Sequence, residues 1–289
     1  MTETTRPSWR QVAHGYLVLP HAVPIVVVMS ATAAFALIAS RGWPGTGPMT
    51  WLLLAMFGGQ LAVGAVNEIV DADLDGLTKP SKPIPAGLVS RRGAWAVAIA
   101  GCLAMAVFSL RFDFPVFLVC ALGTGVGIAY SVWFKRTIWS WIPYLIALPL
   151  LPIWVWLALS EVDPGLYAIY PIGAAAVIAV QIAQSIPDVE ADAHGGVRTL
   201  AVALGPEGAR LTCWGALGLA AVLAAALAPW LTDAPRYVWG ATAIAGALIA
   251  VNAVIWMRDA RAGALACFPC VAAGAVVLGL GWTLALVGA

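Results

Sequence analysis

Two short clusters of acidic residues stand at the ends of long apolar runs in this chain of 289 residues. They hold seven of its fourteen acids: Glu68, Asp71, Asp73 and Asp75 in the first cluster, and Asp188, Glu190 and Asp192 in the second. Carboxylates at the point where a membrane helix meets water are costly unless a positive group binds them. The two clusters therefore predict divalent cations and, bound through them, a polyanionic substrate.

Within each cluster, oxygen-bearing side chains recur at every fourth residue. Asn67, Asp71 and Asp75 form one stripe on a helix, and Asp188 and Asp192 form another. Such a stripe presents its oxygens to one volume of space, which suits Mg²⁺, a hard cation that combines carboxylates with substrate phosphate oxygens. We predict all five residues as metal ligands and the four aspartates as catalytic residues.

Asp73 and Glu190 lie about 200° around an ideal helix from their neighbours, so we expect them to orient the site or to pair with loop cations. A solvated helix end would account for one such cluster, but it accounts poorly for two with the same spacing. A shift of 117 residues places Asn67 on Gln184 and Asp71 on Asp188. This echo suggests two related halves within a single transmembrane domain that covers residues 1–289.

The composition of the chain is that of a membrane protein. Hydrophobic residues make up 62% and charged residues only 10%, and the mean hydropathy is +0.92. Apolar stretches of roughly 18–25 residues recur, each long enough to cross a bilayer. We predict spans at about 17–40, 49–70, 93–110, 114–131, 138–159, 165–187, 209–230, 236–256 and 264–287. The expected fold class is all-α and integral to the membrane, with about nine transmembrane helices around a central cavity and both acidic clusters at its cytoplasmic mouth.

The distribution of basic residues predicts how these spans are oriented. With the N-terminus in the cytoplasm, the outer loops hold only Arg41, Arg111 and Arg236. The inner segments hold all the others: Arg6, Arg10, Lys79, Lys82, Arg91, Arg92, Lys135, Arg136, Arg198, Arg210, Arg258 and Arg261. This is the positive-inside pattern, so we expect a cytoplasmic N-terminus and both acidic clusters on the cytoplasmic side. The net charge of +1 gives no indication of a nucleic acid partner.

A polar loop follows each acidic cluster. Residues 77–87 contain three prolines, which exclude a regular helix, and residues 193–200 contain two adjacent glycines that can turn the backbone. Each loop could be a lid over a cavity mouth or a plain connector, and the sequence leaves both open.

Four basic residues near the clusters are candidates for binding a diphosphate: Lys82, Lys135, Arg136 and Arg198. Lys and Arg side chains can neutralise phosphate oxygens that a metal leaves uncompensated. Each could equally serve as a cytoplasmic topology signal, which is how we interpret Arg91. His14 and His21, near the start of the first span, are expected to be interfacial polar residues without partners.

Three motifs, in this order along the chain, resemble those of the UbiA superfamily of intramembrane prenyltransferases. The first superfamily signature is similar to Asn67-x-x-x-Asp71-x-x-x-Asp75 followed by Lys82-Pro83-Ile84-x-x-Gly87. The superfamily element after the fourth helix is similar to Tyr130 followed by Lys135-Arg136. The second signature is similar to Asp188-x-x-x-Asp192 followed by Gly196, Thr199, Leu200 and Gly205.

The resemblance implies a Mg²⁺-dependent enzyme in membrane lipid that acts on an isoprenyl diphosphate and an aromatic or quinone-like acceptor. Both signatures would hold Mg²⁺ ions that bridge the diphosphate, whose departure leaves an allylic carbocation in a water-poor cavity. Metal charge assists departure of an anionic group, exclusion of water prevents quenching, and aromatic faces steady a cation. The residues that we assign to diphosphate binding are Asn67, Lys82, Tyr130, Lys135, Arg136 and Arg198.

The chain departs from the family pattern just before the second signature. Homogentisate and chlorophyll-type prenyltransferases often carry a Lys-Asp or Asn-Asp pair there, whereas this chain has Gln184 and Ser185, which we assign to the cavity and the acceptor. Transfer to an acceptor is the leading expectation, and a UbiA-type terpene cyclase, in which the substrate's own alkene captures the cation, is the alternative. A transporter ranks third, since it would place ionisable groups deep within its helices.

Overall fold

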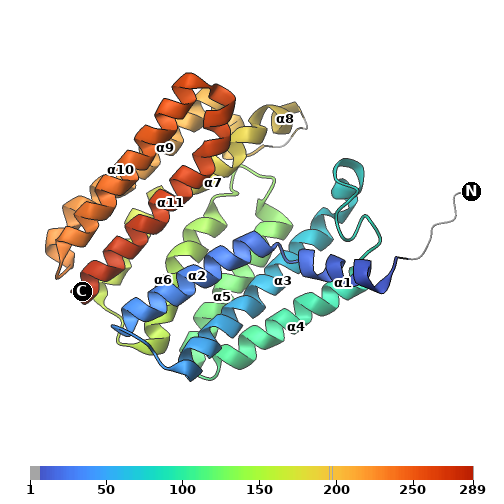
Figure 1. The fold of residues 1–289 in the computed structure, drawn as a ribbon, viewed down its shortest axis with the longest axis horizontal. Coiled ribbons are helices and arrows are strands. Elements are labelled where there is room, and N and C mark those ends of the chain that lie inside the picture. The colour runs from blue at the N-terminus through green and yellow to red at the C-terminus, as the bar shows by residue number, and fades with distance from the viewer. Residues whose placement is uncertain (1–6, 195, 197, 289) are drawn as a thin grey trace, which may run out of the picture. The chain divides into compact units, whose positions relative to one another are not determined.

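The structure is a computed structural model that describes residues 7–194, 196 and 198–288, except for the side chains of Val23, Ala191 and Asp192. Its described secondary structure is helical throughout (Figure 1). The described residues form two compact units, one of residues 7–33 and 46–132 and the other of residues 34–45 and 133–288. The first acidic cluster lies in the first unit and the second cluster in the second unit.

The first unit is built around one long helix, α3 (Thr46–Thr78), with the other helices α1 (Trp9–Val18), most of α2 (Ala22–Ala39), α4 (Arg91–Ser109) and α5 (Phe114–Ala129). α3 packs along α4 and α5, and α3 and α4 run side by side in Figure 1. Glycine permits this approach, because a Cβ at Gly58 would lie 2.6 Å from the backbone nitrogen of Met105. Close backbone packing therefore holds the middle of α3 against α4.

The second unit contains the remaining elements. They are α6 (Ile142–Leu159), η2 (Pro164–Ala168), α7 (Ile169–Ser185), η3 (Ile186–Asp188), α8 (Val189–His194), α9 (Leu200–Leu231), α10 (Pro235–Arg258) and α11 (Ala260–Val287). α9, α10 and α11 pack against one another, and α7 packs on α6, α9 and α11. A buried hydrogen bond of 3.0 Å from Trp282 Nε1 to the carbonyl of Gly165 ties α11 to η2. A π turn, η1 (Tyr130–Phe134), lies at the change from one unit to the other.

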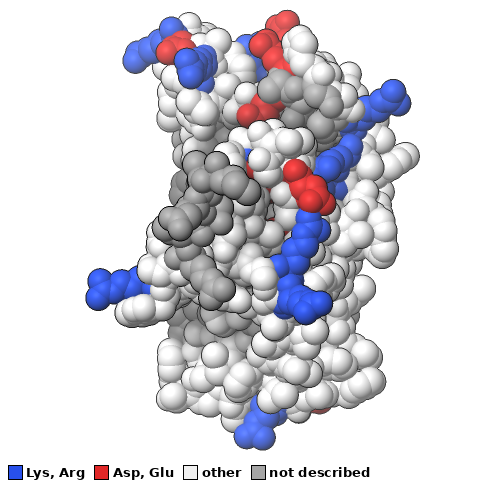
Figure 2. Space-filling view, turned by 90° about the vertical axis from the view of Figure 1, so that its right-hand side faces the viewer, with Lys and Arg blue, Asp and Glu red and all other residues white. Residues whose placement is uncertain are grey.

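The helices confirm an integral, multi-pass membrane protein. Within the described residues, 8 helices are long and apolar enough to cross a membrane, and a shorter apolar helix covers Pro24–Ala39. Together they agree with the nine spans expected from the sequence. Figure 2 shows a surface largely without charged side chains, on which Lys, Arg, Asp and Glu are confined to a few groups. Such a surface suits contact with lipid.

Three helical segments differ from the prediction. The first span is interrupted at Pro20 and His21, so that α1 and α2 are separate helices, because proline cannot continue the helical hydrogen bonding. α9 has a break at Gly205, where φ is 69° and ψ is 170°, followed by Pro206. Only glycine adopts this backbone conformation readily. α3 also continues to Thr78, eight residues past the predicted end, so the whole first cluster is helical.

Candidate functional site

The acidic end of α3 carries the predicted stripe. Asn67, Asp71 and Asp75 lie on this single helix, and Asp71 and Asp75 are buried, with 6% and 5% of their surfaces exposed. Glu68, which the sequence analysis left without a role, is 1% exposed. Three buried carboxylates within eight residues require compensation by cations, because burial of a charge is costly otherwise.

Lys82 supplies part of that compensation. Its ammonium group donates a hydrogen bond of 2.6 Å to Glu68 Oε1 and lies 2.9 Å from Asp75 Oδ2. Burial alone would lower the pKa of Lys82, but its hydrogen bonds and charge interactions with Glu68 and Asp75 outweigh burial and raise that pKa above the ordinary value. Lys82 is therefore a charged member of the site.

The loop that presents Lys82 is packed onto the first unit. The backbone N–H groups of Leu88 and Val89 both donate hydrogen bonds of 3.0 Å to the carbonyl of Pro83. Val89 is buried in a core cluster with Ala65 of α3, and Ile84 packs against the same cluster. The loop is thus an anchored structure that holds a cation over α3, which is more than a plain connector provides.

His21 has partners that the sequence analysis did not foresee. Its Nε2 lies 3.1 Å from Glu68 Oε1 and 3.3 Å from Asn67 Nδ2. The expectation that His21 is a polar residue without partners is therefore wrong. The local sequence gives no indication of these contacts, because 46 residues separate His21 from Asn67. The two residues meet only because the α1–α2 turn packs on α3.

The chemistry of this helix end fits a divalent cation. Among the described residues, Glu68 Oε2 is a buried oxygen without a hydrogen-bond partner, so it remains available to a further donor or a cation. Within the described part of the chain, no three His, Cys, Asp or Glu side chains form a preassembled metal cluster. Mg²⁺ does not require one, since it is commonly held by one or two carboxylates together with water and substrate phosphates.

The second acidic cluster is less regular than predicted. Asp188 ends the 3₁₀ turn η3, and α8 begins only at Val189, so the expected continuous helical stripe is interrupted. Pro187 explains why α7 gives way to a 3₁₀ turn here, because it lacks an N–H group and its ring opposes an α-helical turn before it. Asp188 and Glu190 are exposed, and the side chain of Asp192 lies outside the described residues.

Gln184 and Ser185 end α7 just before this turn, and both have neutral partners. The hydroxyl of Tyr144 donates a hydrogen bond of 3.4 Å to Gln184 Oε1. The hydroxyl of Ser185 donates to the carbonyl of Gln181, also at 3.4 Å. Each residue of the pair is thus held by a hydrogen bond to a neighbouring group.

The remaining predicted residues fall in two polar segments. Tyr130 opens the π turn, and Lys135 and Arg136 follow that turn directly. Lys135 is half-buried and Arg136 exposed. Arg198 is exposed just before Thr199, which caps α9 by accepting a hydrogen bond from the N–H of Val202. These placements leave the role of each residue in diphosphate binding a prediction.

Asp73 and Arg91, two charged residues at the surface, form an ion pair. Asp73 pairs with the guanidinium of Arg91, as expected for a carboxylate on the far side of the stripe. Arg91, which we interpreted only as a topology signal, thus has a structural contact as well. The side chain of Asp73 is 88% exposed, so this pair contributes little to stability.

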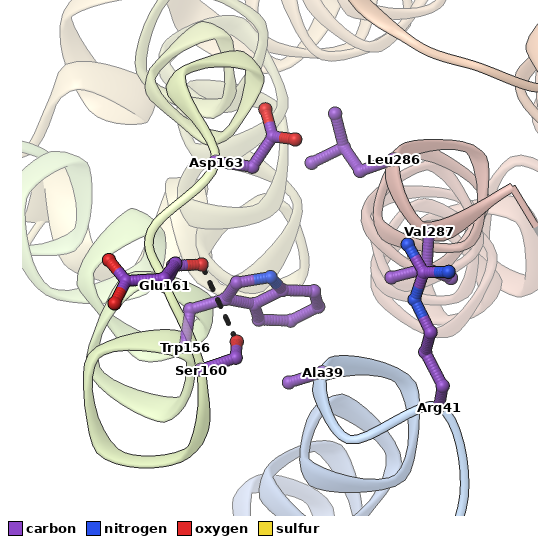
Figure 3. A pocket seen from close by; sticks show the side chains of 8 residues that line it. All are labelled: Ala39, Arg41, Trp156, Ser160, Glu161, Asp163, Leu286 and Val287. Carbon is purple, nitrogen blue, oxygen red and sulfur yellow. Dashed lines mark hydrogen bonds between the residues drawn. The ribbon is translucent and has the colours of Figure 1, made fainter.

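A small pocket of about 180 Å³ in the second unit is separate from the acidic segments (Figure 3). Trp156, Ser160, Glu161 and Asp163 line one part of it, and Arg41 and the end of α11 line another. Asp163 accepts a hydrogen bond from the N–H of Gly165 and caps η2. Because η2 precedes α7 and Asp188 follows it, the pocket lies at the opposite end of α7 from the second cluster.

The fold and the site together define a class: all-helical, multi-span membrane proteins with carboxylates at helix ends. Within that class, the match to a family model assigns this chain. The model of the UbiA prenyltransferase family matches residues 27–268, and the chain belongs to that family. The resemblance noted in the motifs is thereby confirmed.

Individual relatives agree with this assignment. The bacteriochlorophyll synthase 33 kDa chain of Rhodobacter capsulatus is 30% identical over 218 residues, 68% of this chain and 67% of that protein. The digeranylgeranylglyceryl phosphate synthase of Natronomonas pharaonis is 26% identical over 147 residues, 50% of this chain and 52% of the enzyme. The chain thus matches about half the length of that archaeal relative.

Solved structures share the fold. A structure of digeranylgeranylglyceryl phosphate synthase matches with a TM-score of 0.75 and 15% identity, covering 96% of this chain and 100% of the other. A UbiA homologue from Archaeoglobus fulgidus bound to GPP and Mg²⁺ matches with a TM-score of 0.72 and 20% identity, covering 93% of this chain and 99% of the other.

Proposed function

We propose that this protein is a Mg²⁺-dependent intramembrane prenyltransferase that ionises an isoprenyl diphosphate and transfers the prenyl group to an aromatic or quinone-like acceptor. The observation that carries the proposal is the acidic end of α3, where Asp71 and Asp75 are buried on one stripe and Lys82 is held beside them. The named relatives support the reaction type, and the homologue with GPP and Mg²⁺ supports the cofactor.

In this proposal Asn67, Asp71 and Asp75 hold Mg²⁺ from the first unit, and Asp188 and Asp192 do so from the second. The metal supplies charge that stabilises the departing diphosphate. Lys82, Lys135, Arg136 and Arg198 compensate the oxygens that remain, and Tyr130 orients them. Apolar helices exclude water from the allylic cation that is left, which prevents its conversion to an alcohol.

A second candidate is a terpene cyclase of the same family. It is favoured by the uncharged Gln184, which accepts a hydrogen bond from the hydroxyl of Tyr144, because cyclisation needs no charged base to activate an acceptor. The two candidates share the ionisation step and differ in what captures the cation.

The test is one incubation series with the purified full chain. C10 to C25 prenyl diphosphates and Mg²⁺ are supplied with and without an acceptor panel that includes aromatic, quinone, glyceryl phosphate and chlorophyll-type molecules. Adducts that require an acceptor support transfer, and cyclic hydrocarbon without an acceptor supports cyclisation. Unchanged turnover in excess EDTA, after confirmed removal of metal, would contradict the ionisation mechanism.

A further inference from the structure

The turn between α1 and α2 is held against the acidic helix by an unusually close contact. Gly64 of α3 faces Pro20, and a Cβ at Gly64 would lie 2.7 Å from the carbonyl oxygen and 2.8 Å from the Cα of Pro20. The neighbouring Leu19 is fully buried in the core cluster that also contains Val89 of the Lys82 loop. These contacts therefore fix the distance between the turn and α3.

His21 follows Pro20 in this turn, and its backbone is in the left-handed region with φ of 57°. A residue other than glycine in this region is strained, and such strain persists where the surrounding structure determines the conformation. Gly64 precedes Asn67 and Glu68 by three and four residues, so all three share one face of α3. The strained turn thus places the imidazole directly over Asn67 and Glu68.

One ring nitrogen of His21 contacts both of these side chains. Nε2 lies 3.1 Å from Glu68 Oε1 and 3.3 Å from Asn67 Nδ2. The same oxygen of Glu68 accepts the hydrogen bond of 2.6 Å from Lys82. An Nε2–H that donates to Glu68 cannot accept from the Asn67 amide as well, so the contact with Asn67 is one of packing against the edge of the ring. The space available to the predicted ligand Asn67 and the position of the cation Lys82 therefore both depend on the imidazole.

We propose that His21 is a positioning residue for the first acidic segment, acting on Asn67 directly and on Lys82 through Glu68. The inference rests on the proposed function for the identity of the ligand, a divalent cation. Groups that orient metal ligands from behind typically change metal affinity by 10–100-fold when removed, so removal of the imidazole should weaken metal binding by about tenfold or more.

The decisive variant is His21→Gly. Glycine adopts φ of 57° without strain, so this change removes the imidazole and leaves the turn able to form, whereas alanine would add backbone strain of its own. His14→Ala is the matched control, because His14 is an exposed residue of α1. Mn²⁺ alone and Mn²⁺ with inorganic diphosphate serve as probes, and electron paramagnetic resonance measures bound metal on the purified full chain.

We expect His21→Gly to bind Mn²⁺ about tenfold more weakly than the wild-type protein and His14→Ala to bind it within twofold. Binding by His21→Gly within twofold of the wild type would overturn the proposal. Because no prenyl substrate is used, this comparison remains decisive even if the protein proves to have no prenyl-transferring activity. The two hypotheses therefore fail separately.

Glu68→Gln tests the route through Glu68 without relying on the turn. It retains the size of a fully buried side chain and removes the charge that Lys82 and His21 contact, so its Mn²⁺ affinity should also fall. If His21 acts partly through Glu68, the double variant should be weakened by less than the product of the two single effects. Full multiplication of the effects would show that His21 acts independently of Glu68 and would overturn that part of the proposal.

Discussion

The ammonium nitrogen of Lys82 lies 2.6 Å from Oε1 of Glu68, which precedes it by 14 residues. This contact joins a proline-rich loop to the acidic end of a membrane helix. It also places a positive charge among buried carboxylates, where, under the proposed function, a diphosphate binds beside Mg²⁺. The same contact therefore attaches the loop to α3 and supplies a positive charge. The contribution of that charge to stability can be measured by varying pH.

Lys82 should remain charged throughout the neutral range. Its hydrogen bonds and charge interactions raise its pKa despite burial, so it stabilises the fold fully below the ordinary lysine pKa of about 10.4 and loses that effect as pH rises through the folded value. We expect Lys82→Met to lower the melting temperature equally at pH 7 and pH 9, with the difference from wild type declining only above the ordinary lysine pKa of about 10.4. The exposed Lys79, changed to methionine, is the control; a Lys82 effect that fades between pH 7 and 9 contradicts this assignment.

Loss of either leading aspartate should abolish turnover while the protein still folds. Removal of a metal-binding charge costs several kcal/mol of stabilisation, so Asp71→Asn and Asp188→Asn should each reduce turnover by at least about a hundredfold. Diphosphate release and melting temperature are measured together. Asp233→Asn is the matched control on an exposed residue, and an equal loss in that variant would indicate a general charge effect.

Asp113 is unsuitable as such a control, although its sequence position suggests an ordinary loop charge. Its carboxylate accepts a hydrogen bond of 2.8 Å from the N–H of Val116 and caps α5. Asp113→Ala should therefore lower stability by about 1 kcal/mol without entering the chemistry.

Gln184 should separate transfer from cyclisation. Gln184→Ala and Tyr144→Phe remove the same hydrogen bond from opposite sides. Under transfer, both should slow adduct formation or weaken acceptor binding. Under cyclisation, both should change the product distribution more than the rate of diphosphate release. Joint measurement of diphosphate and organic products distinguishes these results, and variants unchanged in both would remove this pair from the site.

Gly205 and Gly215 should respond with opposite sign to the same substitution. Gly205 has φ of 69° and ψ of 170°, a conformation in which alanine costs about 1–3 kcal/mol. Gly215 is an exposed residue in the regular part of α9, where alanine gains up to about 1 kcal/mol. Thermal unfolding measures both. A neutral Gly205→Ala variant would show that the break in α9 is not fixed by this glycine.

The sequence predicts the helices better than their interruptions. Spans follow from apolar length, and the stripe of Asn67, Asp71 and Asp75 follows from helical periodicity, which α3 obeys. The second stripe was expected on equal grounds, but Asp188 ends a 3₁₀ turn that contains Pro187, and α8 begins only at the next residue. Local propensity alone could have warned of this, since proline opposes the α-helical turn before it.

Contacts between segments that are distant along the chain could not be predicted from the sequence, for a different reason. His21 appears in the sequence as a solitary interfacial histidine, because no acidic residue lies near it along the chain. Its role emerges only when Gly64 allows Pro20 to approach α3. Lys82 was expected to contact substrate, yet its observed partners are Glu68 and Asp75, which depend on how the loop folds back.

The length of α3 has a consequence for how substrate is supplied. Its 33 residues extend about 50 Å, whereas the hydrocarbon core of a bilayer is about 30 Å thick. Asn67 lies about 30 Å along the helix from Thr46, so an upright helix that enters the hydrocarbon at Thr46 would leave it near Asn67. Under the proposed function, a diphosphate head stays among lipid headgroups while its tail never leaves the bilayer. The rate should then follow the mole fraction of substrate in the lipid, and adding inert lipid at constant total substrate should slow the enzyme by surface dilution.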